Sequence, residues 1–329
     1  MSESLPLIDL ATRFPELEPD TIRALRQFYA PGAPQITDVT VGKARELAQE
    51  YLSLVGSALP PARAVRKEVV RIPQAGCECH IYWPPGMRKG RSRRRAPTLW
   101  FHGGGWVLGS AALHEPWARL MCSRSGTVVI DVDYPLAPEH PFPLPILSGV
   151  QVLAWVVSQQ RELGIDIHRM VVGGESAGAH IANGVSTLAL QTDLCPIGRQ
   201  VLALPVTDLR SRARYESRTR FNFPELLLTR RDLEYFTAHY IGKRKRDGWL
   251  ASPAAGAPPV RLPPSDVIIG SCDLLRDEGK AYANRLRAAR SRCRVHVLRG
   301  GVHNSLELAG YCRSGRVGLN LLGDLLRAP

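Results

Sequence analysis

The order of apolar and polar positions predicts short strands that alternate with longer helices along most of the chain. Two amphipathic helices are predicted at its start, the second over residues 41–55, where apolar residues recur at helical spacing. Short apolar runs predict strands at residues 64–72, 77–83, 98–101, 127–131, 169–173, 201–206, 266–270 and 294–298. Further helices are predicted at residues 144–163, 176–190, 277–290 and 304–308. Continuous apolar runs between helices are typical of a mostly parallel sheet that helices cover on both faces.

One stretch, residues 208–250, interrupts this alternation and lies between two predicted strands. It is rich in arginine and aromatic residues, and it is too long for a plain loop in a compact domain. We expect a helical insertion above the carboxyl ends of the strands, with the two N-terminal helices as its partners. The predicted division is therefore N-terminal helices in 1–60, an α/β core in 61–207 and 251–329, and an inserted cap segment in 208–250.

Composition narrows the class of protein. The 329 residues are 44% apolar and 22% charged, which is ordinary for a globular protein and excludes a disordered or fibrous chain. No window approaches 18 uninterrupted apolar residues, so no membrane span is expected. Residues 1–20 have no basic start and no apolar centre, so a cytoplasmic location is expected. Seven cysteines without a Cys-x-x-Cys pair predict reduced, mostly buried thiols and no structural zinc.

The formal net charge is +13, and one run contributes a good part of it. Six of the eight residues in 88–95 are basic, with glycine and serine among them and no aromatic residue. Nucleic-acid binders place basic residues on one helix face or interleave them with aromatics. We therefore expect a solvated loop between two strands and no specific nucleic-acid binding, with weak polyanion binding as the alternative.

Residues 174–178 read Gly-Glu-Ser-Ala-Gly, a Gly-x-Ser-x-Gly match between a predicted strand and a predicted helix. A sharp strand-to-helix turn holds such a serine in a strained conformation and leaves its hydroxyl exposed at the helix N-terminus. Ser176 is therefore the candidate nucleophile. Residues 102–106 read His-Gly-Gly-Gly-Trp directly after another strand. Consecutive glycines can present backbone N–H groups to an oxyanion without an intervening side chain.

A serine needs a base to take its proton, and the base needs an acid that orients it. His303 and Asp273 each follow a predicted strand on the same side as Ser176, and the chain order Ser, Asp, His fits a hydrolase. Asp277 and Glu278 also lie near the acid position, but they begin a predicted helix, where carboxylates are favoured by the helix dipole.

These motifs resemble those of the hormone-sensitive-lipase family (bacterial family IV) of α/β-hydrolases. The resemblance rests on residues 102–106, 131–143, 174–178 and 273–279, which are similar to the family's HGGG, D-Y-R-L-A-P-E-H-P-F-P, G-D-S-A-G and D-x-L-x-D-E-G patterns, with Glu175 in place of the usual aspartate. It implies an α/β-hydrolase with a mostly parallel central sheet, flanking helices and a helical cap.

The resemblance also implies a serine carboxylesterase for small esters of short to medium chain length, with no metal and no cofactor. It implies the following roles: Ser176 as nucleophile, His303 as base, Asp273 as acid, and the N–H groups of Gly104, Gly105 and Ala177 as the oxyanion hole. The stretch 131–143 is expected to brace the glycine loop. Assembly as a homodimer stays open.

Two other functions remain at this point. An amidase or deacylase could use the same triad, and a non-catalytic ligand receptor could use the same fold, although the presence of His303 argues against a receptor. Glu175 beside the serine is expected to form a salt bridge, with tuning of the site as the alternative. Arg214 and Arg218 in the inserted segment are expected to be solvated, with recognition of an anionic substrate as the alternative.

Overall fold

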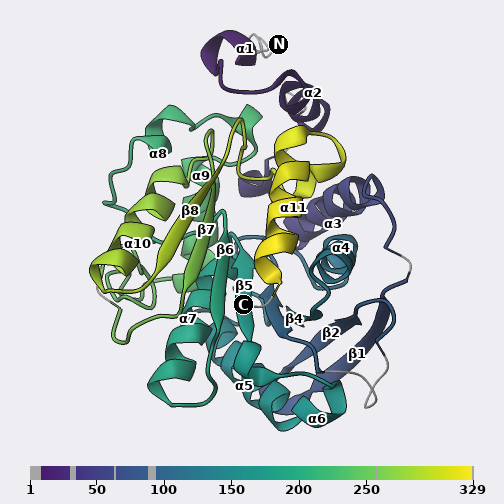
Figure 1. The fold of residues 1–329 in the computed structure, drawn as a ribbon. Helices are drawn as coiled ribbons and strands as arrows, with labels where there is room; N and C mark the ends of the chain where they lie inside the picture. The colour runs from purple at the N-terminus through teal and green to yellow at the C-terminus, as the bar shows by residue number, and fades with distance from the viewer. Residues whose placement is uncertain (1–8, 30–34, 63, 88–93, 257, 328–329) are drawn as a thin grey trace.

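The computed structural model describes residues 9–29, 35–62, 64–87, 94–256 and 258–327. The chain forms one eight-stranded sheet in the order β1-β2-β4-β3-β5-β6-β7-β8 (Figure 1). The strands are β1 Arg66–Ile72, β2 Cys77–Trp83, β3 Pro97–Phe101, β4 Val128–Asp133, β5 Val171–Glu175, β6 Arg199–Ala203, β7 Ser265–Gly270 and β8 Cys293–Leu298. β2 is antiparallel to β1 and β4, and all other neighbours are parallel. The predicted mostly parallel sheet is confirmed.

Helices cover both faces of the sheet because successive side chains of a strand point to opposite sides. In β3, Leu99 and Phe101 belong to the apolar cluster that packs against α5 Leu144–Ser158 and α7 Ala177–Gln191. Trp100 between them belongs to the cluster on the other face. That face is covered by α4 Glu115–Ser125 and α11 Arg313–Leu326, while α10 Arg276–Ala288 packs against β7 and β8.

Several predicted boundaries were wrong. β6 ends at Ala203, so residues 204–206 lie beyond it, and the predicted helix at 144–163 is divided into α5 and α6 Gln160–Leu163. Within α5, the apolar side chain of Leu147 is 45% exposed. Residues 304–308 do not form the predicted helix; a 3-10 turn lies at Glu307–Gly310. The helices α4 and α11 had no counterpart among the predictions.

The sequence of α11 explains why the pattern of apolar and polar positions did not predict this helix. Glycines at 315, 318 and 323 lower its intrinsic helix propensity. An added Cβ would lie 2.1 Å from the Ser305 carbonyl oxygen at Gly315, and 2.8 Å from the Arg124 Cβ at Gly323. These glycines therefore let the helix approach its neighbours closely, and tertiary packing outweighs propensity.

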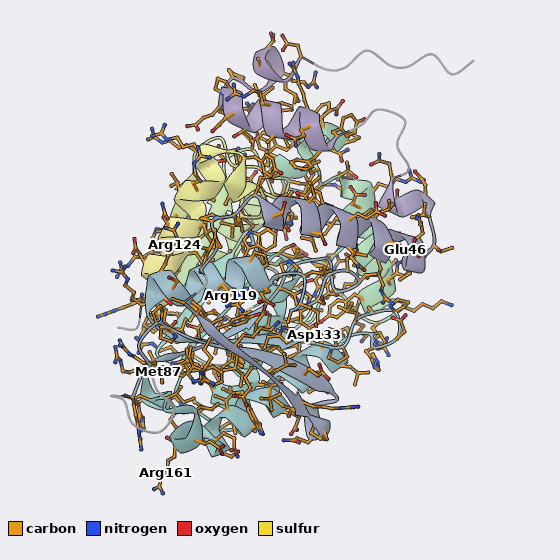
Figure 2. All side chains as sticks on the ribbon, turned by 90° about the vertical axis from the view of Figure 1, so that its right-hand side faces the viewer. Glu46, Met87, Arg119, Arg124, Asp133 and Arg161 are labelled. Atoms are coloured by element: carbon orange, nitrogen blue, oxygen red, sulfur yellow. The ribbon has the colours of Figure 1, made fainter. Side chains whose placement is uncertain are left out.

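Segments far apart in the sequence meet at one end of the sheet (Figure 1). The N-terminal segment supplies α1 Leu10–Arg13, α2 Pro19–Phe28 and α3 Val41–Ser57, and the insertion supplies α8 Ser217–Arg220 and α9 Arg230–Ile241. The Phe14 ring lies 5.8 Å from that of Phe221, and Arg220 pairs with Glu16 at 2.8 Å. α3 also packs against α4 of the core, below it in Figure 2.

The described part of the chain contains neither a membrane-spanning helix nor a cluster of metal ligands. No helix there is long and apolar enough to cross a bilayer. No group of three His, Cys, Asp or Glu residues in the described ranges is arranged to hold a metal ion. All seven cysteines are free, and six of them are buried, as predicted. Residues 88–93 of the basic run lie outside the described residues, so the loop expected there is not described.

We expect the packing of α11 to contribute strongly to stability. Leu322 is 2% exposed and Val317 on the same helix is 49% exposed. Leu322→Ala should therefore lower the free energy of unfolding by about 2–5 kcal/mol, because it leaves a cavity in the core. Val317→Ala should change it by less than about 0.5 kcal/mol. Urea unfolding measures both, and equal losses in the two variants would contradict the assigned packing.

Candidate active site

Ser176 lies at a sharp turn between β5 and α7. Its backbone angles are φ 54° and ψ −116°, a conformation that L-residues rarely adopt. Two glycines make the turn sterically possible. A Cβ at Gly174 would lie 2.4 Å from the Gly178 carbonyl oxygen, and a Cβ at Gly178 would lie 2.1 Å from the carbonyl oxygen of Phe101. The Gly-x-Ser-x-Gly pattern therefore reflects close backbone contact both within the turn and with the end of β3.

The structure brings together Ser176, His303 and Asp273. The Ser176 Oγ lies 2.8 Å from the His303 Nε2, and the His303 Nδ1 lies 3.2 Å from each carboxylate oxygen of Asp273. His303 follows β8 and Asp273 follows β7, so parallel strands deliver them to the same edge of the sheet. The Leu275 N–H also donates to the Asp273 Oδ1 at 2.8 Å, which fixes that carboxylate.

The neighbouring carboxylates are held elsewhere. Glu278 accepts hydrogen bonds from the Thr207 N–H at 2.8 Å and from the Arg218 Nε at 2.8 Å. Asp277 accepts a hydrogen bond from the Ser217 N–H at 2.9 Å. Both groups join the start of α10 to the inserted segment, and neither forms a hydrogen bond or an ion pair with His303.

The protonation of His303 depends on opposing effects. Burial disfavours the charged ring, but the charge of Asp273 and its hydrogen bond outweigh burial, so the pKa of His303 is raised above its usual value. Glu307 and Glu278 act in the same direction from farther away. The ring is therefore a stronger proton acceptor than a free histidine.

The predicted oxyanion residues surround Ser176. Gly104 and Gly105 have φ of 114° and 61°, and both line the same cavity as Ser176. At Gly105 a Cβ would lie 2.3 Å from the ring of Phe236, so α9 of the insertion packs directly on this glycine. Ala177 is the first residue of α7, and its N–H has no acceptor within the helix.

Residues that follow β4 and one N-terminal helix support the glycine loop. The Tyr134 hydroxyl donates to the His102 carbonyl at 3.0 Å, as the expected bracing role of 131–143 requires. Sequence reasoning missed Arg45 on α3, which donates to the Val107 and Ala137 carbonyls at 3.0 Å each and pairs with Glu139 at 2.6 Å. Nothing in the sequence distinguishes Arg45 from other helical arginines.

The serine opens into an apolar cavity of about 330 Å³. Its walls come from the N-terminal helices, the insertion and the core, and its apolar lining includes Phe28, Leu47, Leu52, Val206, Leu228, Leu233, Phe236 and Leu275. The volume lies at the lower end of the range of ligand pockets.

The lining of this cavity includes the carboxyl groups of Glu175, Asp232 and Glu307, and Glu307 acts on His303. Burial raises the pKa of Glu307 to about 7, and burial together with Glu307 raises the pKa of Glu175 well above its usual range. The salt bridge expected at Glu175 was wrong, because no lysine or arginine of the described segments lies within 4.0 Å of it. Glu307 follows His303 by four residues, a helical spacing that could have indicated it.

The sequence and the structure of this chain are both similar to those of known proteins. Residues 98–307 match the model of the alpha/beta hydrolase fold family. Esterase LipI of Mycobacterium tuberculosis is 33% identical over 241 residues, 70% of this chain and 71% of that protein. Carboxylesterase NlhH of the same species is 34% identical over 215 residues, and the chain spans 65% of its length. A hyperthermophilic esterase from the archaeon Pyrobaculum calidifontis has a similar structure, with TM-score 0.86 and 29% identity over 94% of this chain and 98% of that one.

We expect Gly178→Ala to abolish the reactivity of Ser176, because the added Cβ meets the Phe101 carbonyl oxygen at 2.1 Å. Gly103→Ala is the matched control, since a Cβ there has its nearest atom at 3.7 Å. The rate of labelling by a fluorophosphonate probe measures both. Equal labelling of the two variants would contradict the steric account of the turn.

We expect the pH dependence of fluorophosphonate labelling to show the effect of Glu307 on the pKa of His303. Its negative charge favours the protonated His303, so Glu307→Gln should lower the pKa of His303 and move the acid limb of labelling to lower pH by up to about 1 unit. Glu46→Gln serves as the control, because Glu46 lies on the outside of α3 (Figure 2). An unmoved acid limb in Glu307→Gln would show that Glu307 does not act on His303.

Proposed function

This chain belongs to the alpha/beta hydrolase fold family, and on that premise we propose that it is a serine carboxylesterase that acts through Ser176, His303 and Asp273. The fold predicted from the sequence is thereby confirmed. The observation that carries the proposal is the Ser176 Oγ at 2.8 Å from the His303 Nε2, beside two left-handed glycines and inside an apolar cavity.

Acylation begins with proton transfer from the Ser176 Oγ to the His303 Nε2 as the oxygen attacks the ester carbonyl carbon. Asp273 holds the ring through Nδ1 and stabilises the imidazolium that forms. The tetrahedral intermediate then collapses, the bond from carbon to the alcohol oxygen breaks, and the imidazolium gives its proton to the leaving alcohol. An acyl-enzyme on Ser176 remains.

Deacylation repeats these steps with water as the nucleophile. His303 takes a proton from the water as it attacks the acyl carbon, and it returns the proton to the Ser176 oxygen when the acid leaves. In both steps the negative oxygen of the intermediate accepts hydrogen bonds from the N–H groups of Gly104, Gly105 and Ala177. Removal of one such donor costs roughly 10²–10³ in rate in comparable enzymes.

The cap of this enzyme consists of the helices within residues 1–60 together with the insertion 208–250, above a core formed by 61–207 and 251–329. Both parts of the cap contribute walls to the cavity, through Leu52 on one side and Phe236 on the other. An apolar cavity of about 330 Å³ suits a small neutral ester of short to medium chain length. Cytoplasmic location and homodimer assembly stay predictions, which cell fractionation and sedimentation would test.

Rates on p-nitrophenyl esters from acetate to palmitate test the proposal directly. We expect activity that peaks at short chains and falls by about 10⁴-fold or more in Ser176→Ala, because the nucleophile is lost. Ser158→Ala, a serine exposed on α5, should retain the activity of the natural chain.

Other outcomes would replace the proposal. Faster turnover of a matched anilide than of the ester would indicate an amidase. A folded protein that neither turns over esters nor reacts with a fluorophosphonate would indicate a ligand receptor. Activity that survives in Ser176→Ala would exclude the acyl-enzyme on this serine.

A further inference from the structure

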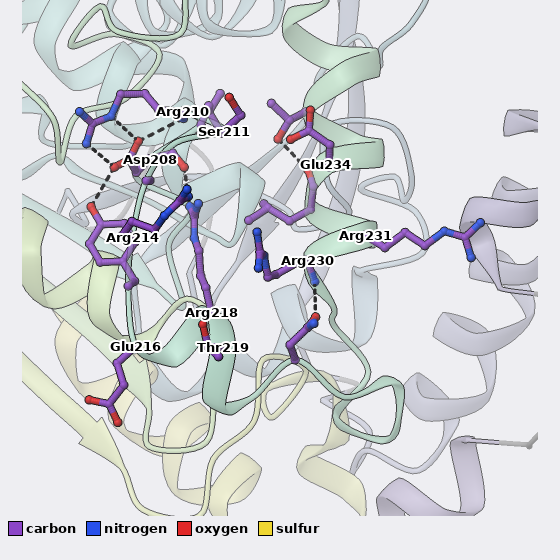
Figure 3. Close-up of a pocket in the computed structure, with 16 residues that line it drawn as sticks. Asp208, Arg210, Ser211, Arg214, Glu216, Arg218, Thr219, Arg230, Arg231 and Glu234 are labelled. Atoms are coloured by element: carbon purple, nitrogen blue, oxygen red, sulfur yellow. Dashed lines mark hydrogen bonds and ion pairs between the residues drawn. The ribbon is translucent and has the colours of Figure 1, made fainter. Parts of the chain in front are cut away.

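A second, larger cavity of about 920 Å³ lies within the insertion (Figure 3). Residues 208–219 form one wall, and the first turns of α9 form the other. We call it the arginine groove. Neither Ser176 nor His303 lines it, so it is distinct from the cavity that holds the serine.

The groove is lined by five arginines and three carboxylates, namely Arg210, Arg214, Arg218, Arg230, Arg231, Asp208, Glu216 and Glu234. The positive charges of two of these arginines are neutralised by carboxylates at the base of the groove. Arg210 pairs with Asp208 at 2.7 Å, and the buried Arg218 pairs with Glu278. Because carboxylates of the fold pair with Arg210 and Arg218, these two arginines stabilise the wall of the groove.

Arg214 and Arg230 differ from these two. Both side chains are exposed, and neither has a carboxylate within 4.0 Å among the residues that the structure describes. Figure 3 shows the Arg230 side chain extending from the α9 side toward the wall that carries Arg214 and Arg218, while Arg231 points the other way. Arg231 pairs with Asp38 instead. The two unmatched guanidinium groups therefore face one space from opposite walls.

The carboxylates of the groove do not offset these two charges. Asp208 also accepts the Tyr215 hydroxyl at 2.8 Å, and Glu234 pairs with Arg246 at 3.0 Å. Glu216 points away from Arg230 (Figure 3). Neutral hydrogen-bonding groups, among them the side chains of Ser211, Thr219 and Asn222, also belong to the lining.

Helix α9 separates the groove from the active cavity. Arg230, Glu234 and Thr237 face the groove, while Asp232 and Phe236 face the cavity, and Leu233 lines both. This division follows from helical periodicity, because residues three and four positions apart share a face. A ligand that bridges the two walls of the groove would therefore fix the helix that carries Phe236 onto Gly105.

We propose that the arginine groove binds a small molecule with two or more negative charges, whose phosphate or carboxylate oxygens bridge Arg214 and Arg230. Guanidinium groups suit such oxygens because they donate two parallel hydrogen bonds in a planar fork. The site is independent of the proposed ester hydrolysis, since it lies on the opposite face of α9 from Ser176.

Calorimetric titration with inorganic phosphate and with citrate tests this site and distinguishes the two ligand chemistries. The full chain should bind at least one of the two probes, and the double variant Arg214→Ala/Arg230→Ala should bind it at least tenfold more weakly. Arg212→Ala is the matched control, because this exposed arginine pairs with Asp247 and does not line the groove. Circular dichroism checks that the double variant keeps its fold, as expected for two exposed side chains.

Three results would overturn the proposal. One is equal affinity in the double variant and the natural chain, and another is no binding of either probe at millimolar concentration. The third is that titration with sodium chloride at matched ionic strength produces the same heat as titration with the probe. That result would indicate general screening of a basic protein. Ser176→Ala should bind the probe with unchanged affinity, whatever the outcome of the esterase test.

Discussion

The backbone of the β5–α7 turn lies so close to the end of β3 that only hydrogen fits at Gly178. A Cβ there would reach both the Phe101 and the His102 carbonyl oxygens, at 2.1 and 2.3 Å. This approach places the strained Ser176 beside the glycine loop that follows β3, and it fixes the distance between Ser176 and the N–H groups of that loop. The other parts of the site are arranged around this contact, including the histidine loop after β8 and the Phe236 ring that covers Gly105.

The environment of the serine combines an apolar cavity with charges held at one side. Asp273 is 1% exposed and fully committed to His303 and to the Leu275 N–H, so its negative charge has a defined position. Glu175 and Glu307 lie on the same side, where burial prevents both from carrying a full charge at neutral pH.

The helices above the strands show how distant segments depend on one another. Arg45 in the N-terminal segment donates to carbonyls of the glycine loop and of the stretch after β4, and Phe14 packs against Phe221 of the insertion. α9 presents one face to the active cavity and the other to the arginine groove. The position of this single helix therefore affects both spaces, because it is the wall between them.

Local pattern was sufficient for the sheet and for the three residues that the structure brings together at the candidate site. The buried strands are continuous apolar runs, and Ser176, Asp273 and His303 each follow a strand in short motifs whose geometry is local. Helices such as α11 could not be predicted, since their glycines oppose helix formation in isolation and are explained only by the neighbours they approach. The contacts of Arg45, the burial of Glu307 and the lack of a carboxylate partner for Arg214 and Arg230 among the described residues were likewise decided by the tertiary structure. Burial, the absence of a partner and contact between distant segments are properties of the folded chain, and no sequence spacing encodes them directly.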